Sequence, residues 1–161
     1  MGVRSPKQFG TQLIVCHRNE FWKRILPRVP LCRLFAAIRS QGLRIGKASD
    51  GDEMLQRATV ERLGLSTMVD AVVTSESCGR AKPSAQFFEA LLKALGVRSP
   101  RQAMMVGDSI VRDIQGAQAA GIRIALVTVL SAEEPNDRVR PDLRLLTVYG
   151  LGAHIRLAGV T

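Results

Sequence analysis

Residues 101–128 read RQAMMVGDSIVRDIQGAQAAGIRIALVT, and this stretch decides the predicted fold. An apolar strand over 103–106 is followed by a helix over 110–120, whose apolar residues recur at helical spacing. A second apolar strand covers 123–128. Strands that are apolar on both faces are typical of a parallel sheet covered by helices. The stretch therefore predicts one strand–helix–strand unit of an α/β domain.

The same alternation extends along most of the chain. Upstream it predicts helices over 31–40, 54–63 and 84–95 and strands over 43–48 and 70–74, and downstream a loop over 131–142, an edge strand over 143–148 and a helix over 151–157. Ser49 or Asp50 is expected to cap the second helix. We expect an α/β fold with three layers and a Rossmann-like parallel sheet. Ligands of such sheets bind beyond the carboxyl ends of the strands.

Composition excludes several classes of protein. The chain has 161 residues, 46% of them hydrophobic, which suits one soluble domain. Its apolar runs, such as 124–127, are far shorter than the roughly 20 residues of a membrane span. The 3 cysteines include no paired motif, which argues against a disulfide framework or a zinc site. We therefore expect a cytoplasmic protein with reduced thiols and no membrane contact.

Positive charge is concentrated at the N-terminus. The net charge is +9, and residues 1–42 hold eight basic side chains and one acidic side chain, which gives 8 − 1 = +7. A basic segment can bind nucleic acid. No nucleic-acid-binding motif accompanies these charges, so we rank that function last, behind a solvated surface. The oligomeric state is not predicted.

Four polar residues follow the predicted strands. Ser49 ends one strand, Lys82 lies in the turn before the helix at 84–95, and Asp108 and Asp113 straddle a strand-to-helix turn. Paired carboxylates suit Mg²⁺, and a lysine can hold a phosphate as a point charge. Each residue alone also has a plain interpretation. Ser49 and Asp108 can cap helices, Asp113 can be solvated, and Lys82 can be an exposed loop lysine.

Together these residues resemble the motifs of the haloacid dehalogenase-like hydrolases. Ser49 matches the second motif, Lys82 the third, and Asp108 with Asp113 the fourth. The resemblance covers about 27–128 and is closest to the phosphatase and β-phosphoglucomutase-like members. It implies a Mg²⁺-dependent phosphatase of a small phosphorylated metabolite. In that family Ser49 and Lys82 would hold the phosphoryl oxygens, and Asp108 and Asp113 would hold Mg²⁺.

The sequence departs from the family at the nucleophile. The family's Asp-x-Asp motif is missing, because residues 1–48 contain no aspartate. The family's cap domain is absent or vestigial. We expect a basic segment over 1–26, either a cap remnant or a replacement strand, before a core over 27–161. The chain would then be a fragment, splice product or mispredicted gene product that is impaired alone. The alternative is a non-catalytic remnant that binds metal and phosphate.

The missing motif also affects the sheet. In the family, the first strand lies between the strands that carry the second and fourth motifs, so its omission leaves two unpaired strand edges. The apolar run over 11–16 is the only candidate to fill the gap. Cys16 would then lie near the nucleophile's place, where we expect a buried bystander. Lys47 occupies a strand position that favours an apolar residue, and the sequence explains it no further.

Overall fold

The structure of the protein is a computed structural model that describes residues 29–128 and 139–158. Its helices are α2 (Val29–Ser40), α3 (Glu53–Arg62), α4 (Ser75–Cys78), α5 (Ala85–Ala94), α6 (Gly116–Ala119) and α7 (Leu151–Ala158). Its strands are β1 (Gly46–Ser49), β2 (Ala71–Thr74), β3 (Met104–Gly107), β4 (Arg123–Val127) and β5 (Leu143–Leu145). Short η helices cover Pro100–Gln102, Ile110–Gln115 and Val148–Gly150. The predicted alternation and the α/β class are confirmed.

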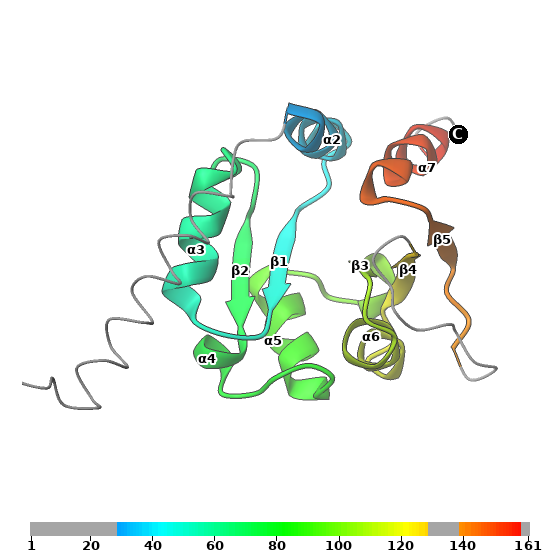
Figure 1. The fold of residues 1–161 in the computed structure, drawn as a ribbon. Coiled ribbons are helices and arrows are strands. Elements are labelled where there is room, and N and C mark those ends of the chain that lie inside the picture. The colour runs from blue at the N-terminus through cyan, green and yellow to red at the C-terminus, as the bar shows by residue number, and fades with distance from the viewer. Residues whose placement is uncertain (1–28, 129–138, 159–161) are drawn as a thin grey trace, which may run out of the picture.

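The described strands form two parallel sheets rather than one. One sheet has the order β1-β2 and the other the order β3-β4-β5. In the first sheet Ser49 lies opposite Thr74, and in the second Gly107 lies opposite Leu126. Figure 1 shows the sheets side by side, with β1 on the side of its sheet that faces the second sheet. A single continuous sheet is therefore not what the described residues build.

The facing edges of β1 and β3 have no strand partner among the described residues. This is the arrangement expected when the first strand of the family is missing. The carbonyl of Ala48 in β1 instead accepts a hydrogen bond from Lys82 Nζ, at 3.5 Å. The run over 11–16, which we predicted as a replacement strand, lies outside the described residues, as does Cys16.

Helix α5 joins the two sheets through the core. Helix α5 is amphipathic, and its apolar face buries Phe87, Phe88, Leu91 and Leu92. They share one core cluster with Val73 of β2 and with Ile114, Ile124 and Leu126 of the second half. Phe88 packs so close to Gly116 that a Cβ there would lie 2.5 Å from its ring. The absence of a side chain at Gly116 therefore permits α5 and α6 to meet.

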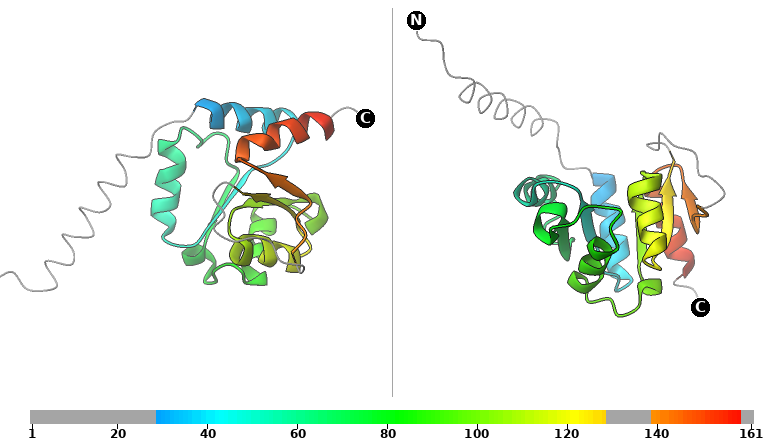
Figure 2. Two further views of the ribbon diagram at one scale, coloured as in Figure 1. Left: turned by 45° about the vertical axis from the view of Figure 1, so that its right-hand side comes forward. Right: turned by 90° about the horizontal axis from the view of Figure 1, so that it is seen from below.

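A second pair of packed helices, α2 with α7, also connects the two halves of the protein. Figure 2 shows α2 beside α7. Leu34 of α2 is buried, and its Cδ1 lies 3.5 Å from the place of a Cβ on Gly152 of α7. The two halves of the protein are therefore held together by side-chain packing between helices.

Local structure corrects several expectations. The first strand begins at Gly46 rather than residue 43, and β5 ends at Leu145 rather than residue 148. Neither Ser49 nor Asp50 caps α3, because the Asp52 side chain accepts the Leu55 N–H at 2.7 Å. The predicted single α-helix over 110–120 is a π-helix over Ile110–Gln115 followed by α6. This wider turn follows from the Ile114 N–H bonding to the Ser109 carbonyl, five residues back, at 3.2 Å.

Candidate functional site

A buried ion pair stands at the centre of the candidate site. Lys82 Nζ lies 2.7 Å from Asp113 Oδ1, and the two side chains are only 10% and 8% exposed. The second oxygen of Asp113 accepts the Ser109 N–H at 3.2 Å. The interpretations of Asp113 as a solvated carboxylate and of Lys82 as an exposed loop lysine are therefore wrong. A buried charge needs a partner, and each of these residues supplies it for the other.

Lys82 also reaches the end of β1 on both sides of Ser49. Its Nζ lies 3.5 Å from the carbonyl oxygen of Ala48, and its backbone N–H donates to Asp50 Oδ1 at 3.0 Å. One lysine thus connects the carboxyl end of the first sheet to the helix that follows β3 in the second. The helix predicted from residue 84 begins at Ala85, with Ser84 at its N-cap position.

Ser49 lies at the carboxyl end of β1 and is half-buried. It stands opposite Thr74, a fully buried residue whose hydroxyl accepts the Ser77 N–H at 3.1 Å and so caps α4. The neighbouring loop is tied to α4 by Gly51, whose N–H donates to Ser75 Oγ at 2.7 Å. Because Asp52 caps α3, the Ser49 hydroxyl does not serve as the cap of that helix.

The carboxyl end of β3 places Asp108 and Asp113 differently. Asp108 is exposed, and Ser109 rather than Asp108 caps the next helix by accepting the Arg112 N–H at 3.3 Å. Asp113 folds back against Gly107, where a Cβ would stand 2.5 Å from Asp113 Oδ2. Glycine at position 107 is therefore required for Asp113 to reach Lys82.

Asp50 and Arg112 are site residues that sequence reasoning missed. Asp50 accepts the Lys82 N–H, and its second oxygen lies 3.8 Å from Arg112 Nη1. The signal in the sequence was the position of Asp50 directly after Ser49, at a strand end. The sequence predicts Asp50 as a strand-end residue and a possible helix cap, but not its contact with the segment at 82, which depends on the tertiary fold.

The side chains present fit Mg²⁺ only together with an anionic ligand. Both oxygens of Asp113 already accept hydrogen bonds, which leaves the exposed Asp108 as the open carboxylate beside it. The described residues hold no group of three or more His, Cys, Asp or Glu side chains that would enclose a metal ion. Mg²⁺ usually keeps several waters and binds through one or two carboxylates plus a phosphate of the substrate. Asp108 and Asp113 match this pattern, because they would leave the other coordination positions of Mg²⁺ to waters and a phosphate.

Comparison with known proteins identifies the family. The sequence model of the haloacid dehalogenase-like hydrolases matches residues 7–121. This chain belongs to that family. It is 36% identical over 141 residues to the glyceraldehyde 3-phosphate phosphatase of Methanothermobacter thermautotrophicus, covering 88% of this chain and 62% of that protein. It is 35% identical over 125 residues to the phosphoserine phosphatase of Thermus thermophilus, covering 76% of this chain and 49% of that protein.

Solved structures agree on the fold. A haloacid dehalogenase-type phosphatase from Thermococcus onnurineus superposes with a TM-score of 0.67 at 26% identity, over 76% of this chain and 55% of that one. The L-2-haloacid dehalogenase of Xanthobacter autotrophicus gives a TM-score of 0.70 at 21% identity, over 87% and 64%. This chain spans about half the length of the curated relatives that it matches, for example 62% of the Methanothermobacter phosphatase and 49% of the Thermus phosphatase.

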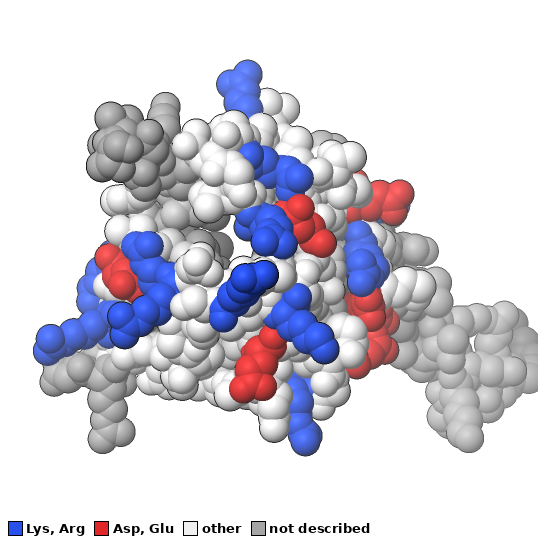
Figure 3. Space-filling view, turned by 180° about the vertical axis from the view of Figure 1, so that it is seen from behind, with Lys and Arg blue, Asp and Glu red and all other residues white. Residues whose placement is uncertain are grey.

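The nucleic-acid alternative rests on the positive charge of residues 1–42. On the face seen in Figure 3, Lys and Arg side chains outnumber Asp and Glu. Of the basic residues over 1–42, the structure describes Arg33 and Arg39, and Arg39 is paired with Asp70 at 2.7 Å. The others lie outside the described residues. Among the helices that the structure describes, none is long and apolar enough to cross a bilayer.

Proposed function

We propose that this chain carries the phosphoryl-binding part of a haloacid dehalogenase-type phosphatase site. The observation that carries the proposal is the buried Lys82–Asp113 pair, which lies between the end of β1 and the end of β3. An ammonium group has three N–H donors. Two of them are directed to Asp113 and Ala48 at 2.7 and 3.5 Å, which leaves the third for an anionic ligand.

The proposed ligand is the phosphoryl group of a small phosphorylated metabolite. The Ser49 hydroxyl and the Lys82 ammonium would donate hydrogen bonds to phosphoryl oxygens, and Asp113 would keep Lys82 in place. Asp108, assisted by Asp113, would hold Mg²⁺, which when bound offsets the negative charge of the phosphoryl group. The names of the relatives, phosphatases of glyceraldehyde 3-phosphate and phosphoserine, support this substrate class. The free thiols of Cys32 and Cys78 suit the reducing cytoplasm.

We further propose that these 161 residues bind without turnover. The family's reaction begins with attack of an aspartate on phosphorus, and residues 1–48 hold no aspartate. Positioning and charge stabilisation by Ser49 and Lys82 accelerate a reaction only when a nucleophile is present. The chain would therefore retain recognition of the phosphoryl group while hydrolysis is lost.

Thermal unfolding with inorganic phosphate and Mg²⁺ tests the binding. At 100 times the dissociation constant, a ligand that binds only the native state stabilises it by about 2.7 kcal/mol. We expect the wild-type chain to gain stability with both ligands and Ser49→Ala to lose most of that gain. Ser99→Ala is the matched control, since Ser99 is exposed and makes no capping bond. An equal gain in all three proteins would contradict the proposed phosphate site.

Hydrolysis of p-nitrophenyl phosphate tests the loss of turnover. We expect no Mg²⁺-dependent hydrolysis above the rate of a blank without protein. Hydrolysis that disappears in Asp108→Ala would instead show an active enzyme, and it would refute the impairment while supporting the site.

A further inference from the structure

Arg112 lies on the rim of the proposed phosphoryl site. Its Nη1 lies 3.8 Å from Asp50 Oδ2, and its Nε–H donates to Ser109 Oγ at 3.4 Å. Asp50 directly follows Ser49 at the end of β1, and Ser109 comes directly after Asp108 beyond the end of β3. The guanidinium of Arg112 therefore spans the two strand ends whose residues we propose to bind the phosphoryl group and Mg²⁺.

Arg112 is on the solvent side of that site. Its side chain is 60% exposed, whereas the side chain of Lys82 is 10% exposed. The Lys82 backbone N–H donates to Asp50 Oδ1 at 3.0 Å, so a single carboxylate separates Lys82 from Arg112. Because the Lys82 end of the site is buried, the rest of a bound metabolite extends towards solvent, on the side of Arg112. The groups next to the phosphoryl group then come within reach of the guanidinium.

Arg112 keeps unused hydrogen-bond donors in the described part of the chain. A guanidinium has five N–H groups. Among the described residues, only the Nε–H of Arg112 donates a hydrogen bond. The contact with Asp50 at 3.8 Å is longer than the roughly 2.7–3.2 Å of an N–H···O hydrogen bond. An exposed ion pair of this kind stabilises a protein little, so an anionic ligand can share the guanidinium with Asp50 at little cost.

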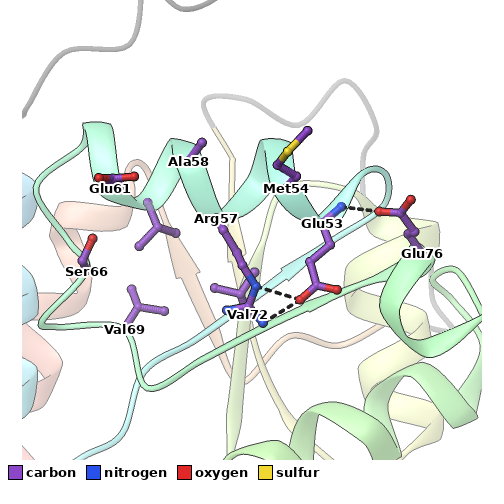
Figure 4. A pocket seen from close by; sticks show the side chains of 10 residues that line it. Glu53, Met54, Arg57, Ala58, Glu61, Ser66, Val69, Val72 and Glu76 are labelled. Atoms are coloured by element: carbon purple, nitrogen blue, oxygen red, sulfur yellow. Dashed lines mark hydrogen bonds and ion pairs between the residues drawn. The ribbon is translucent and has the colours of Figure 1, made fainter.

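The hollow in Figure 4 is unsuited to a second anionic group. It lies between α3 and β2, has a volume of about 750 Å³ and is lined by none of the proposed phosphoryl-site residues. Three glutamates and one arginine, Arg57, line it, and Arg57 is already paired with Glu53 at 2.6 Å. Like charges placed together disfavour binding, so the net negative charge of this hollow disfavours an anion. Arg112 is the better partner for such a group.

We propose that Arg112 selects metabolites that carry a second anionic group close to the phosphoryl group. The inference rests on the phosphoryl site of the proposed function. The planar guanidinium would donate two parallel N–H···O bonds to a carboxylate or to a second phosphate, while Nε stays on Ser109. Asp50 would keep the guanidinium between the two strand ends. Arg112 is then a specificity-determining residue, and the phosphoryl group itself stays with Ser49 and Lys82.

Two phosphate monoesters that differ in one group test this role. Phosphoglycolate carries a carboxylate where hydroxyethyl phosphate carries a neutral alcohol. Isothermal titration calorimetry of the wild-type chain with Mg²⁺ should give a dissociation constant about fivefold to tenfold lower for phosphoglycolate, as expected for one partly solvated ion pair. The bisphosphate of ethylene glycol places a second phosphate at the same position, and its affinity shows which of the two anions Arg112 prefers.

Arg112→Gln should bind phosphoglycolate and hydroxyethyl phosphate with equal affinity. Its affinity for inorganic phosphate should equal that of the wild-type chain, because Ser49 and Lys82 are intact. Arg101→Gln is the matched control and should keep the wild-type preference. Arg101 is exposed and lies in the short helix Pro100–Gln102, before β3 and so at the opposite end of that strand from the site.

The outcomes separate this inference from the proposed function. If the wild-type chain binds inorganic phosphate but binds all three esters equally, the role of Arg112 is overturned and the phosphoryl site stands. If Arg112→Gln weakens inorganic phosphate and every ester alike, the role is also overturned, because Arg112 then contacts the phosphoryl group itself. A wild-type chain that binds no phosphate ligand would overturn the inference and the proposed function together.

Discussion

Removal of the Asp113 carboxylate provides the most direct test of the structure. In Asp113→Ala the Lys82 ammonium keeps its place at 10% exposure but loses Asp113, its ionic partner among the described residues, and of the described acceptors only Ala48 O at 3.5 Å remains. The Ser109 N–H loses its acceptor as well. Breaking a buried pair by removing one partner costs about 3–5 kcal/mol. A domain has about 5–15 kcal/mol of total stability, so this loss is a large fraction of it.

Urea unfolding followed by far-UV circular dichroism measures this loss. We expect Asp113→Ala to lower the unfolding free energy by about 3–5 kcal/mol, and Asp113→Asn, which keeps an acceptor oxygen, to lower it less. The double variant Lys82→Met with Asp113→Leu should be more stable than Asp113→Ala, because no unpaired charge remains. Arg57→Ala is the control, since its pair with Glu53 is 58% and 33% exposed and should contribute about 1 kcal/mol or less. A loss below about 1 kcal/mol in Asp113→Ala would refute the buried pair.

Three further predictions concern single residues. Burial lowers the pKa of Lys47 below 10.5. Between the lowered pKa and 10.5 the unfolded chain binds more protons than the native chain, so stability rises with pH over that range. Lys47→Met should remove that rise and stabilise the protein at pH 7, and urea midpoints measured from about pH 7 to 11 would show both effects. The side-chain hydrogen bond from Arg39, with that from the Ile45 N–H, holds the pKa of Asp70 below 3.8. Its stabilisation is therefore present above pH 3.8 and lost as the pH falls through the lowered pKa, so Asp70→Asn should flatten acid unfolding, and an unchanged acid profile would contradict this. Gly107→Ala forces a Cβ to 2.5 Å from Asp113 and should cost about 1–3 kcal/mol; an unchanged melting temperature would refute the close contact.

The order of the elements could be predicted because each one has its own periodicity. The apolar spacing of α5 and the glycine-bounded strands β3 and β4 are local signals, and they gave the right element types. Element ends depend on partners that the sequence does not show. The strand β1 begins at Gly46 because its partner begins at Ala71, where Asp70 already bonds the backbone of Ile45.

The candidate site was predictable in its residue types but not in its contacts. Lys82 and Asp113 were expected at one edge of the sheet, and the structure joins them at 2.7 Å. Lys82 also lies beside both neighbours of Ser49, whereas Asp108 is exposed to solvent. The sequence could not show that Asp113 is buried, because its burial depends on the missing side chain of Gly107 and on the wider turn of the π-helix.

The division between β1 and β3 has a consequence for the cooperativity of unfolding. The β1-β2 ladder and the β3-β4-β5 ladder share no backbone hydrogen bonds in the described chain, and a two-stranded ladder is marginal without support from a helix. We expect amide hydrogens of β1 and β2 to exchange with solvent faster than those of β4, through openings that leave the three-stranded half intact. Ser49 ends β1 and Asp108 directly follows β3, so each such opening would move apart the residues that we propose to bind the phosphoryl group and Mg²⁺. Any ligand that bridges them would slow exchange in β1 and β2 most.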